Sequence, residues 1–320
     1  MVESYGSLPL SRGVVVGGVI RDVKALAEVL RTMKKSLPKV HHVHAALPEE
    51  VAYVFTMQIP AESSSEDILK LIEFEFNGRV PIPPSASVYD YDIIAPHQSG
   101  SVEIGVVVFP REVAESYAAS FNAAGITLAS LEIEAASIAR AVSSTAPDEP
   151  VTLIADFGRA RTGIALIKQG VPIFTSTVEV GGESMTRAII EKMSLSPEAA
   201  GVFKNEVGLL AAGSDKNAAL EIVTRSAGAL ADEIARHFHY WDTRRDEKGV
   251  RPTPVGRVTL VGGTSNLKGI SDFISNKVQA PVSRGDVWRN AILFDEYVPP
   301  IDRRTSLEYA TAVGLALRAF

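Results

Sequence analysis

The sequence feature that most constrains the fold is a pair of short apolar segments joined by a polar turn. Residues 151–155 and 163–167 are apolar runs, and the sequence DFGRART lies at the junction between them. Two apolar runs joined by a short turn that contains glycine are typical of a β-hairpin. We therefore expect an antiparallel strand pair with Asp156 at the end of its first strand.

This turn has the residue types of a phosphate site. A tight turn exposes backbone N–H groups, an acid at a strand end can hold a Mg²⁺-bound water, and a threonine hydroxyl can reach a phosphate oxygen. Asp156 and Thr162 are the residues that would supply these groups. The alternative is a plain hairpin with an aspartate in its turn.

A pair of glycines precedes a predicted helix at residues 184–192. Gly181 and Gly182 would let the backbone approach a ligand, and the N-terminus of the helix would attract an anion. Glu183 could instead cap the helix, in which case the pair has only a structural role.

A second pair of glycines follows a predicted strand at residues 257–261. The sequence VTLVGGTSN runs from this strand through Gly262 and Gly263 toward a helix at residues 270–278. Here a flat ring could lie against the exposed backbone. The alternative is an ordinary strand–helix connection with a serine or asparagine cap.

The composition and the absence of common motifs exclude several classes of protein. The 320 residues contain no cysteine, which excludes disulfide scaffolds, zinc ribbons and cysteine nucleophiles. The net charge of −6 argues against a nucleic-acid-binding surface. The chain has no Walker-type phosphate loop, GxGxxG, GxSxG or HExxH sequence. No apolar run approaches the ~20 residues of a membrane span, so we expect a cytoplasmic protein, and any membrane role would have to come through a partner.

Strands and helices alternate along the chain, which favours an α/β or α+β architecture. The clearest linker is TAPDEP at residues 145–150, which is rich in turn-forming residues. We expect a domain boundary there.

The order of these motifs resembles the second lobe of actin-like ATPases. The segments VEVGGESMTRAIIEKM, RVTLVGGTSNLKG and YATAVGLALR are similar to the FtsA and PilM group. The segments FEFNGRVPIPPSASVYDYDII and GVVVFPREVAESYAASFNAAGI resemble the PilM-like type IV pilus assembly proteins in particular. The resemblance covers essentially the whole chain. It implies an α/β, actin-like (ribonuclease H-like) two-lobed fold with an inserted α+β subdomain in the first lobe.

The resemblance also implies a division of the chain. The expected parts are 1–39, first-lobe core with a truncated start; 40–116, inserted subdomain of the SHS2 type; 117–150, first-lobe core continued; 151–305, second lobe; and 306–320, closing helix.

Site residues are implied by the same resemblance. Asp156, Gly158 and Thr162 would form the second phosphate loop, with Asp156 also holding Mg²⁺. Arg159 and Arg161 add bulk and charge to a turn that is usually small in the family. They could grip phosphate or fill the site.

Further residues are expected around the nucleotide. They are Gly181, Gly182 and Glu183 near phosphate or ribose, Lys204 near the nucleotide, and Gly262, Gly263 and Thr264 beside adenosine. Glu134 lies where related ATPases place a water-orienting carboxylate. Its alternative is a solvated position on a strand face shared with Glu132.

Two departures bear on nucleotide binding. Gly201 stands where the family's A-E-x-x-K element has glutamate, and no first phosphate hairpin of the pattern D-x-G-x-x-x-x-K precedes Val2. A triphosphate needs convergent donors and metal ligands, so binding of Mg²⁺ and ATP should be weak or absent and ATPase activity uncertain.

The resemblance implies a cytoplasmic scaffold or adaptor of the type IV pilus inner-membrane platform. Its expected partner is the N-terminal cytoplasmic tail of a PilN-like bitopic membrane protein, bound near the inserted subdomain. A pilus motor ATPase, other platform proteins and a second copy of the chain are further possible partners; nucleic acid and direct membrane insertion are not expected. Two alternatives stay open: an FtsA-like division filament protein, and an active ATPase whose first phosphate loop is missing only from this sequence.

Overall fold

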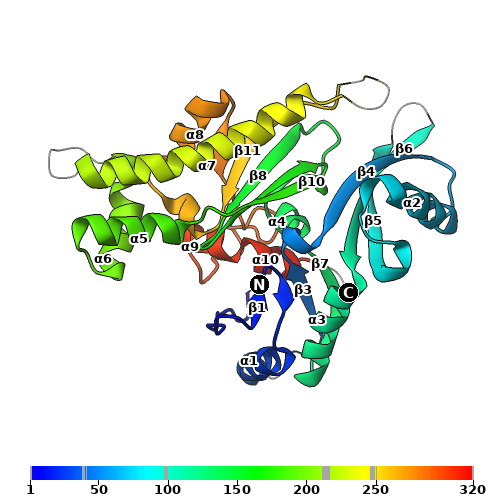
Figure 1. Cartoon of the computed structure of the whole chain (residues 1–320), viewed down its shortest axis with the longest axis horizontal. Helices are drawn as coiled ribbons and strands as arrows, with labels where there is room; N and C mark the ends of the chain where they lie inside the picture. Colours follow the sequence, from blue (N-terminus) through cyan, green and yellow to red (C-terminus); the bar gives the residue numbers. More distant parts are fainter. Residues whose placement is uncertain are drawn as a thin grey trace.

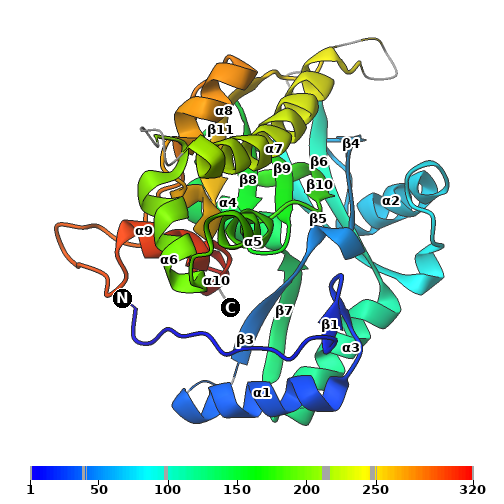
Figure 2. The same cartoon turned by 60° about the vertical axis from the view of Figure 1, so that its left-hand side comes forward.

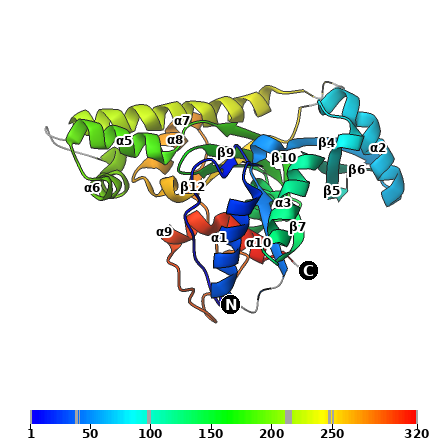
Figure 3. The same ribbon diagram turned by 60° about the horizontal axis from the view of Figure 1, so that its bottom comes forward.

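The computed structural model describes residues 2–37, 40, 42–96, 100–210, 217–245, 249 and 251–318. Its strands form one five-stranded sheet, one three-stranded sheet and two pairs. The five-stranded sheet and its helices lie at one end of the molecule, and the three-stranded sheet lies at the other (Figures 1 and 3).

The five-stranded sheet is built around the predicted hairpin. Its strands are β8 (Val151–Phe157), β9 (Thr162–Lys168), β10 (Val171–Val178), β11 (Val255–Val261) and β12 (Val282–Arg284). The order is β10-β9-β8-β11-β12, with the first three antiparallel and β11 parallel to both β8 and β12. The expected β-hairpin is therefore confirmed, and it lies at the centre of a larger sheet.

Helices cover both faces of this sheet because its strands are apolar on both sides. One face packs on α5 (Gly182–Met193), α6 (Pro197–Val202), α7 (Asn217–Thr243) and α8 (Ile270–Val278). Leu153 belongs to the core under these helices, whereas its neighbour Ile154 packs with α4 on the opposite face. This alternation is the two-residue period of a strand.

The first lobe has a parallel strand pair as its centre. β3 (His42–Leu47) pairs with β7 (Thr127–Ile133), with α1 (Val23–Ser36) and α3 (Arg111–Ala123) packed nearby. A small hairpin of β1 (Val15–Val16) and β2 (Val19–Ile20) precedes α1.

Two helices lie at the junction of the lobes (Figure 2). They are α4 (Glu134–Val142) and α10 (Ala310–Ala316), the latter preceded by α9 (Arg303–Ser306). The two approach closely, because a Cβ added at Gly314 would lie 1.7 Å from the Ser137 carbonyl oxygen. Only glycine at this position permits such backbone contact between helices.

The three-stranded sheet forms a separate subdomain with one helix. Its strands are β4 (Tyr53–Pro60), β5 (Ser87–Pro96) and β6 (Ser101–Pro110), all antiparallel in the order β4-β6-β5. α2 (Ser65–Arg79) buries Ile72 and Phe76 against this sheet. The N-cap Ser64 accepts a hydrogen bond from the amide of Asp67 at 3.2 Å, as the serine-then-acid sequence predicts.

Strand pairing suggests a narrower insertion than residues 40–116. β3 lies within that range but pairs with β7 of the first-lobe core, not with the three-stranded sheet. We therefore propose that the inserted subdomain extends from about β4 to β6, residues 53–110.

Short helical segments connect the larger elements. They are η1 (Glu49–Val51), η2 (Pro84–Ala86), the π-turn η3 (Phe203–Val207), η4 (Gly208–Leu210), η6 (Gly263–Asn266) and η7 (Leu307–Tyr309). Within the described ranges, none of the helices combines the length and the apolar character that a membrane span requires.

Candidate functional site

The first and third sequence motifs meet at Asp156. This residue lies near the end of β8, where it pairs with Gly163 of β9 and with Val261 of β11. Gly262 follows with φ +80°, and a Cβ added there would lie 2.5 Å from Asp156 Oδ1 and from the Phe157 carbonyl oxygen. The glycine is therefore required both by its backbone angle and by the closeness of the carboxyl group.

The second motif packs on the β8–β9 turn. The amide of Gly182 donates to the carbonyl of Gly158 at 3.0 Å, and the amide of Glu183 donates to that of Arg159 at 2.8 Å. A Cβ added at Gly181 would lie 2.5 Å from the Arg159 carbonyl oxygen. The three motifs thus converge, but these two amides at the start of α5 are bound to the protein's own carbonyl groups.

Thr264 and Lys204 complete this cluster. The Thr264 hydroxyl donates to the Gly158 carbonyl at 3.3 Å. The Lys204 ammonium group donates to Thr186 Oγ1 at 3.1 Å and to the Gly182 carbonyl at 3.4 Å. Burial lowers the pKa of Lys204, and the nearby Glu308 opposes that effect. The structure therefore places Lys204 beside the glycine pair; its proximity to a nucleotide stays a prediction.

Three carboxyl groups gather near the hairpin, and one of them was not predicted. Glu49 in η1 is 7% exposed, and its Oε1 accepts a hydrogen bond from the amide of Ala135 at 2.7 Å. Glu49 lies in ALPEEVAY, which has no recognisable motif. Its position directly after a short apolar strand is the only signal that could have pointed to it.

These carboxyl groups hold their protons tightly. Burial raises the pKa of Glu49 to about 8, and the charges of Glu134 and Asp156 add to the effect. Burial, followed by the charge of Glu134, raises the pKa of Asp156 to about 7. The carboxyl group of Asp156 thus keeps its proton to a higher pH than an ordinary aspartate, and that proton competes with a cation for its oxygens.

Arg161 of the β8–β9 turn connects the two lobes. Its Nε lies 3.2 Å from Glu50 Oε1, and its Nη2 lies 3.6 Å from Glu134 Oε2. The guanidinium group of Arg161 is thus engaged by two carboxylates, and both of its predicted roles stay predictions. Glu134 is the first residue of α4 and shares no strand face with Glu132, because β7 ends at Ile133. That alternative for Glu134 was wrong.

Two further predicted residues, Arg159 and Glu183, belong to a group of ion pairs at the surface. Arg159 Nε lies 3.1 Å from Glu183 Oε2, and the side chain of Arg159 is 82% exposed. Arg187 and Arg12 also approach Glu183, at 3.6 and 4.0 Å. Glu183 is therefore held by surface arginines, which contribute little to stability.

The arrangement can be tested for its fit to Mg²⁺ and a triphosphate. Besides the two amides at the start of α5, Thr162 is engaged, since its buried hydroxyl donates to the Val180 carbonyl at 2.6 Å. Across the described ranges, no group of three or more His, Asp or Glu side chains is placed to hold a metal ion. The amides of Gly182 and Glu183 and the hydroxyl of Thr162 are therefore satisfied by the protein itself, and in this arrangement they do not fit a triphosphate.

A second candidate site is a groove between the three-stranded sheet and the first-lobe core. It encloses about 490 Å³ between β5, β7, α4 and the residues after α10. We call it the docking groove. Its apolar surface includes Phe109, Leu131 and Leu317, and its acidic side chains include Asp90 and Asp92.

A buried ion-pair network forms part of the groove wall. Glu132 is 7% exposed and accepts two hydrogen bonds of 2.7 Å from Arg140, as well as one from Arg318. Arg140 also donates to the Gly314 carbonyl at 2.8 Å. The network fixes α10 and the residues after it against α4 and β7.

Solved structures share this architecture. One is a PilM–PilN type IV pilus biogenesis complex, with a TM-score of 0.75, 20% identity, and coverage of 98% of this chain and 90% of that one. Another is the ethanolamine utilization protein EutJ from Carboxydothermus hydrogenoformans, with a TM-score of 0.51, 17% identity, and coverage of 95% of this chain and 77% of that one. A third is MreB5 of Spiroplasma citri bound to ADP, with a TM-score of 0.52, 12% identity, and coverage of 95% of this chain and 77% of that one. These similarities confirm the actin-like two-lobed fold.

The family follows from a comparison of the sequence with family models. A family model for the type IV pilus assembly protein PilM matches residues 1–320. That match spans both lobes and the three-stranded subdomain. This chain belongs to the PilM family of type IV pilus assembly proteins.

Proposed function

We propose that this protein is a cytoplasmic scaffold of the type IV pilus inner-membrane platform, and that it binds the cytoplasmic tail of a PilN-like membrane protein. The observation that carries the proposal is the docking groove. Family membership supports a role in type IV pilus assembly. The similarity to a solved PilM–PilN complex supports a PilN-like partner. Attachment to the inner membrane then comes through the partner.

The groove has the features that an extended peptide needs. Five consecutive residues of β5 (88–92) and three of β7 (131–133) line it. Consecutive residues point to alternate sides of a strand, so the backbone edges of both strands border the groove. Within the described chain, β5 pairs only with β6, and β7 pairs only with β3. An extended tail can therefore add backbone hydrogen bonds while its side chains enter the apolar surface.

This function does not require nucleotide hydrolysis. The donors around Gly158 and Gly182 are satisfied internally, and Arg161 lies among the carboxylates. A rigid two-lobed body with an occupied cleft suits a scaffold better than a nucleotide-driven switch. The ATPase and the FtsA-like filament remain the alternatives, and a pilus motor ATPase or a second copy remain predicted partners.

Tail binding can be tested by fluorescence anisotropy with a labelled peptide of the cognate PilN cytoplasmic tail. Ala136 lies on α4 in the groove wall. Ala136→Trp should fill the groove and weaken binding at least about tenfold. Ala119→Trp, on the exposed face of α3, is the matched control and should bind like wild type.

The same protein preparation tests the alternatives. Tight Mg²⁺-dependent binding of a fluorescent ATP analogue would favour the ATPase. Polymers in electron micrographs that depend on ATP would favour the filament protein. Equal peptide affinity for wild type and Ala136→Trp would contradict the proposed docking groove.

A further inference from the structure

The docking groove is the first of three cavities that share walls. A middle cavity of about 550 Å³ has four residues in common with it: Asp92, Ala136, Arg140 and Leu317. A third cavity of about 230 Å³ shares another four with the middle cavity: Ser143, Ser144, Gln169 and Arg289. The three therefore follow one another along α4, from its first turn to beyond its last.

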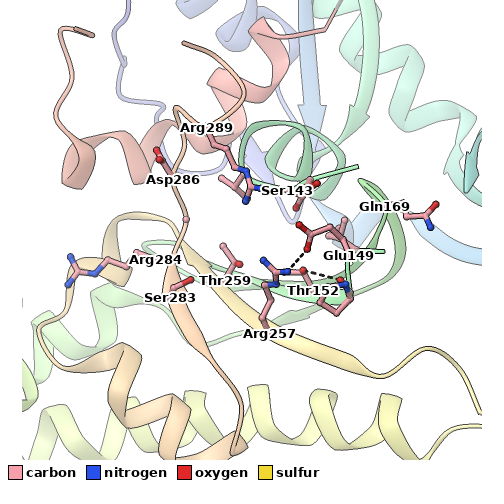
Figure 4. A pocket seen from close by; sticks show the side chains of 15 residues that line it. Ser143, Glu149, Thr152, Gln169, Arg257, Thr259, Ser283, Arg284, Asp286 and Arg289 are labelled. Atoms are coloured by element: carbon pink, nitrogen blue, oxygen red, sulfur yellow. Dashed lines mark hydrogen bonds and ion pairs between the residues drawn. The ribbon is translucent and has the colours of Figure 1, made fainter. Parts of the chain in front are cut away.

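The third cavity, which we call the arginine pocket, is lined by the side chain of Arg289 (Figure 4). The side chain of Arg289 makes no hydrogen bond or ion pair with any part of the chain that the structure describes. In Figure 4 it extends toward Ser143, whose buried Oγ also lacks a hydrogen-bond partner within the described residues. An unpaired guanidinium group next to an unpaired hydroxyl is suited to bind a carboxylate.

Among the other charged side chains of the arginine pocket, Arg257 and Glu149 form an ion pair. Asp286 Oδ1 accepts a hydrogen bond from the amide of Trp288 at 3.2 Å. Neither acid pairs with Arg289. Arg284 also lines this cavity, but Figure 4 shows its side chain directed away from Arg289.

The two ends of the connected cavities differ in charge. At the docking groove, Asp90 and Asp92 are acidic side chains, and the positive charges of Arg140 and Arg318 are used by Glu132. At the arginine pocket, the free charge is positive. A peptide that follows all three cavities thus meets acid at one end and a cation at the other, which gives it a preferred direction.

We infer that the partner's tail continues from the docking groove through the middle cavity and places a carboxylate on Arg289. This inference rests on the proposed function. From Ile133 to Ser143, α4 advances ten residues, or about 15 Å at ~1.5 Å per residue. An extended peptide covers ~3.3 Å per residue. The acidic side chain should therefore lie about five residues from the apolar side chain that fills the docking groove.

The tail would then contact both lobes. The middle cavity is bordered by α4 on one side and by Gly170 and Pro172, at the β9–β10 turn and the start of β10, on the other. The docking groove by itself contacts no strand of the five-stranded sheet. A tail that reaches Arg289 consequently binds across the lobe junction.

The test measures anisotropy of the labelled cognate PilN tail with Arg289→Glu, Arg289→Lys and the matched control Arg21→Glu, an arginine that lines none of the three cavities. Arg289 and Arg21 are both exposed, so folding should be unaffected, as thermal melts will verify. We expect Arg289→Glu to weaken binding about five- to tenfold, Arg289→Lys to retain most of the affinity, and Arg21→Glu to stay within about twofold.

A second arm identifies the carboxylate in the peptide. Each acidic residue of the tail is changed to its amide, one at a time. One change, about five residues from the apolar anchor, should weaken binding to wild type but restore part of the affinity of Arg289→Glu, because the amide no longer faces a like charge.

The outcomes separate this inference from the proposed function. If Ala136→Trp abolishes binding while Arg289→Glu binds like wild type, the extension is wrong and the docking groove stands. If no acidic residue of the tail couples to Arg289, the extension is also overturned. If neither variant changes the affinity, the tail binds elsewhere and both the docking groove and its extension are wrong. If wild type does not bind the tail at all, the proposed function itself fails.

Discussion

Arg161 Nη2 lies 3.6 Å from Glu134 Oε2. The arginine belongs to the β8–β9 turn and the glutamate opens α4, so this ion pair joins the lobes at the point where the resemblance implies a nucleotide. A guanidinium group there neutralises carboxylates that would otherwise need an external cation. The cleft is thereby stabilised by the chain's own residues.

Removing this arginine should destabilise the protein. Arg161→Ala leaves Glu50 and Glu134 without their cation, and both side chains are less than one-third exposed. We expect a loss of about 1–2 kcal/mol in the free energy of unfolding at pH 7, measured in urea. Arg159→Ala removes an arginine of the same turn whose side chain is 82% exposed, and should cost less than ~0.5 kcal/mol. Equal losses in the two variants would contradict the bridging role of Arg161.

Gly262 should not tolerate a side chain. Its φ of +80° is unfavourable for alanine, and the added Cβ would lie 2.5 Å from Asp156 Oδ1. Gly262→Ala should cost at least about 2 kcal/mol, from backbone strain and from steric overlap. Gly228→Ala in α7, where a Cβ meets open space, should instead stabilise by about 0.5–1 kcal/mol. Chemical denaturation measures both, and stability of Gly262→Ala near wild type would refute the close packing of Asp156.

Stability should fall as the pH rises from about 4 to about 8. Asp156 and Glu49 have pKa values raised to about 7 and about 8 in the folded chain. In the unfolded chain the two carboxyl groups have ordinary pKa values of ~4, so they lose their protons at lower pH than in the folded chain. The folded state then binds more protons than the unfolded state, so unfolding becomes easier with each step in pH until both groups are ionised.

Glu49→Gln should reduce this dependence. The amide oxygen can still accept from the Ala135 amide, but no buried charge forms at high pH. We expect the variant to melt about 2–4 °C above wild type at pH 8.5 and within about 1 °C of it at pH 5. Glu66→Gln, at an exposed position of α2, is the control. Identical pH profiles for wild type and Glu49→Gln would exclude a raised pKa at Glu49.

The network at Glu132 should matter more than a surface ion pair. Arg140→Ala removes two hydrogen bonds to a buried carboxylate and one to the Gly314 carbonyl. We expect a loss of about 2–3 kcal/mol. Arg225→Ala breaks a pair with Glu221 in which both side chains are at least 70% exposed, and should cost less than ~0.5 kcal/mol. Urea unfolding curves of the two variants provide the comparison.

The local elements could be predicted from the sequence because their signals are local. The hairpin at residues 151–167, the helix 270–278 and the glycine pairs each follow from neighbouring residues, and the structure has them in place. Glu134 shows the limit. The alternation in LEIE continues the strand pattern, although the helix sequence EAASIARAV begins at that glutamate. A carboxylate in the first turn of a helix is favoured by the helix dipole, and that preference prevails over the strand period.

The parts that could not be predicted depend on residues far apart in the chain. Glu49 reaches the amide of Ala135, 86 positions away, and Arg161 reaches Glu50. No periodicity encodes such pairs, because they are set by how β3, α4 and the β8–β9 turn are placed in space. The docking groove has the same origin, since its walls come from β5, β7, α4 and the residues after α10.

The contact between Glu132 and Arg318 joins positions 186 residues apart. Ribosomes extend a chain at ~5–20 residues per second, so roughly 10–40 s separate the synthesis of these two residues. Throughout that interval β5 and β7 have already been made, but the groove between them lacks one wall. Under the proposed function, the site for the partner's tail therefore gains its last wall only when translation has passed Arg318.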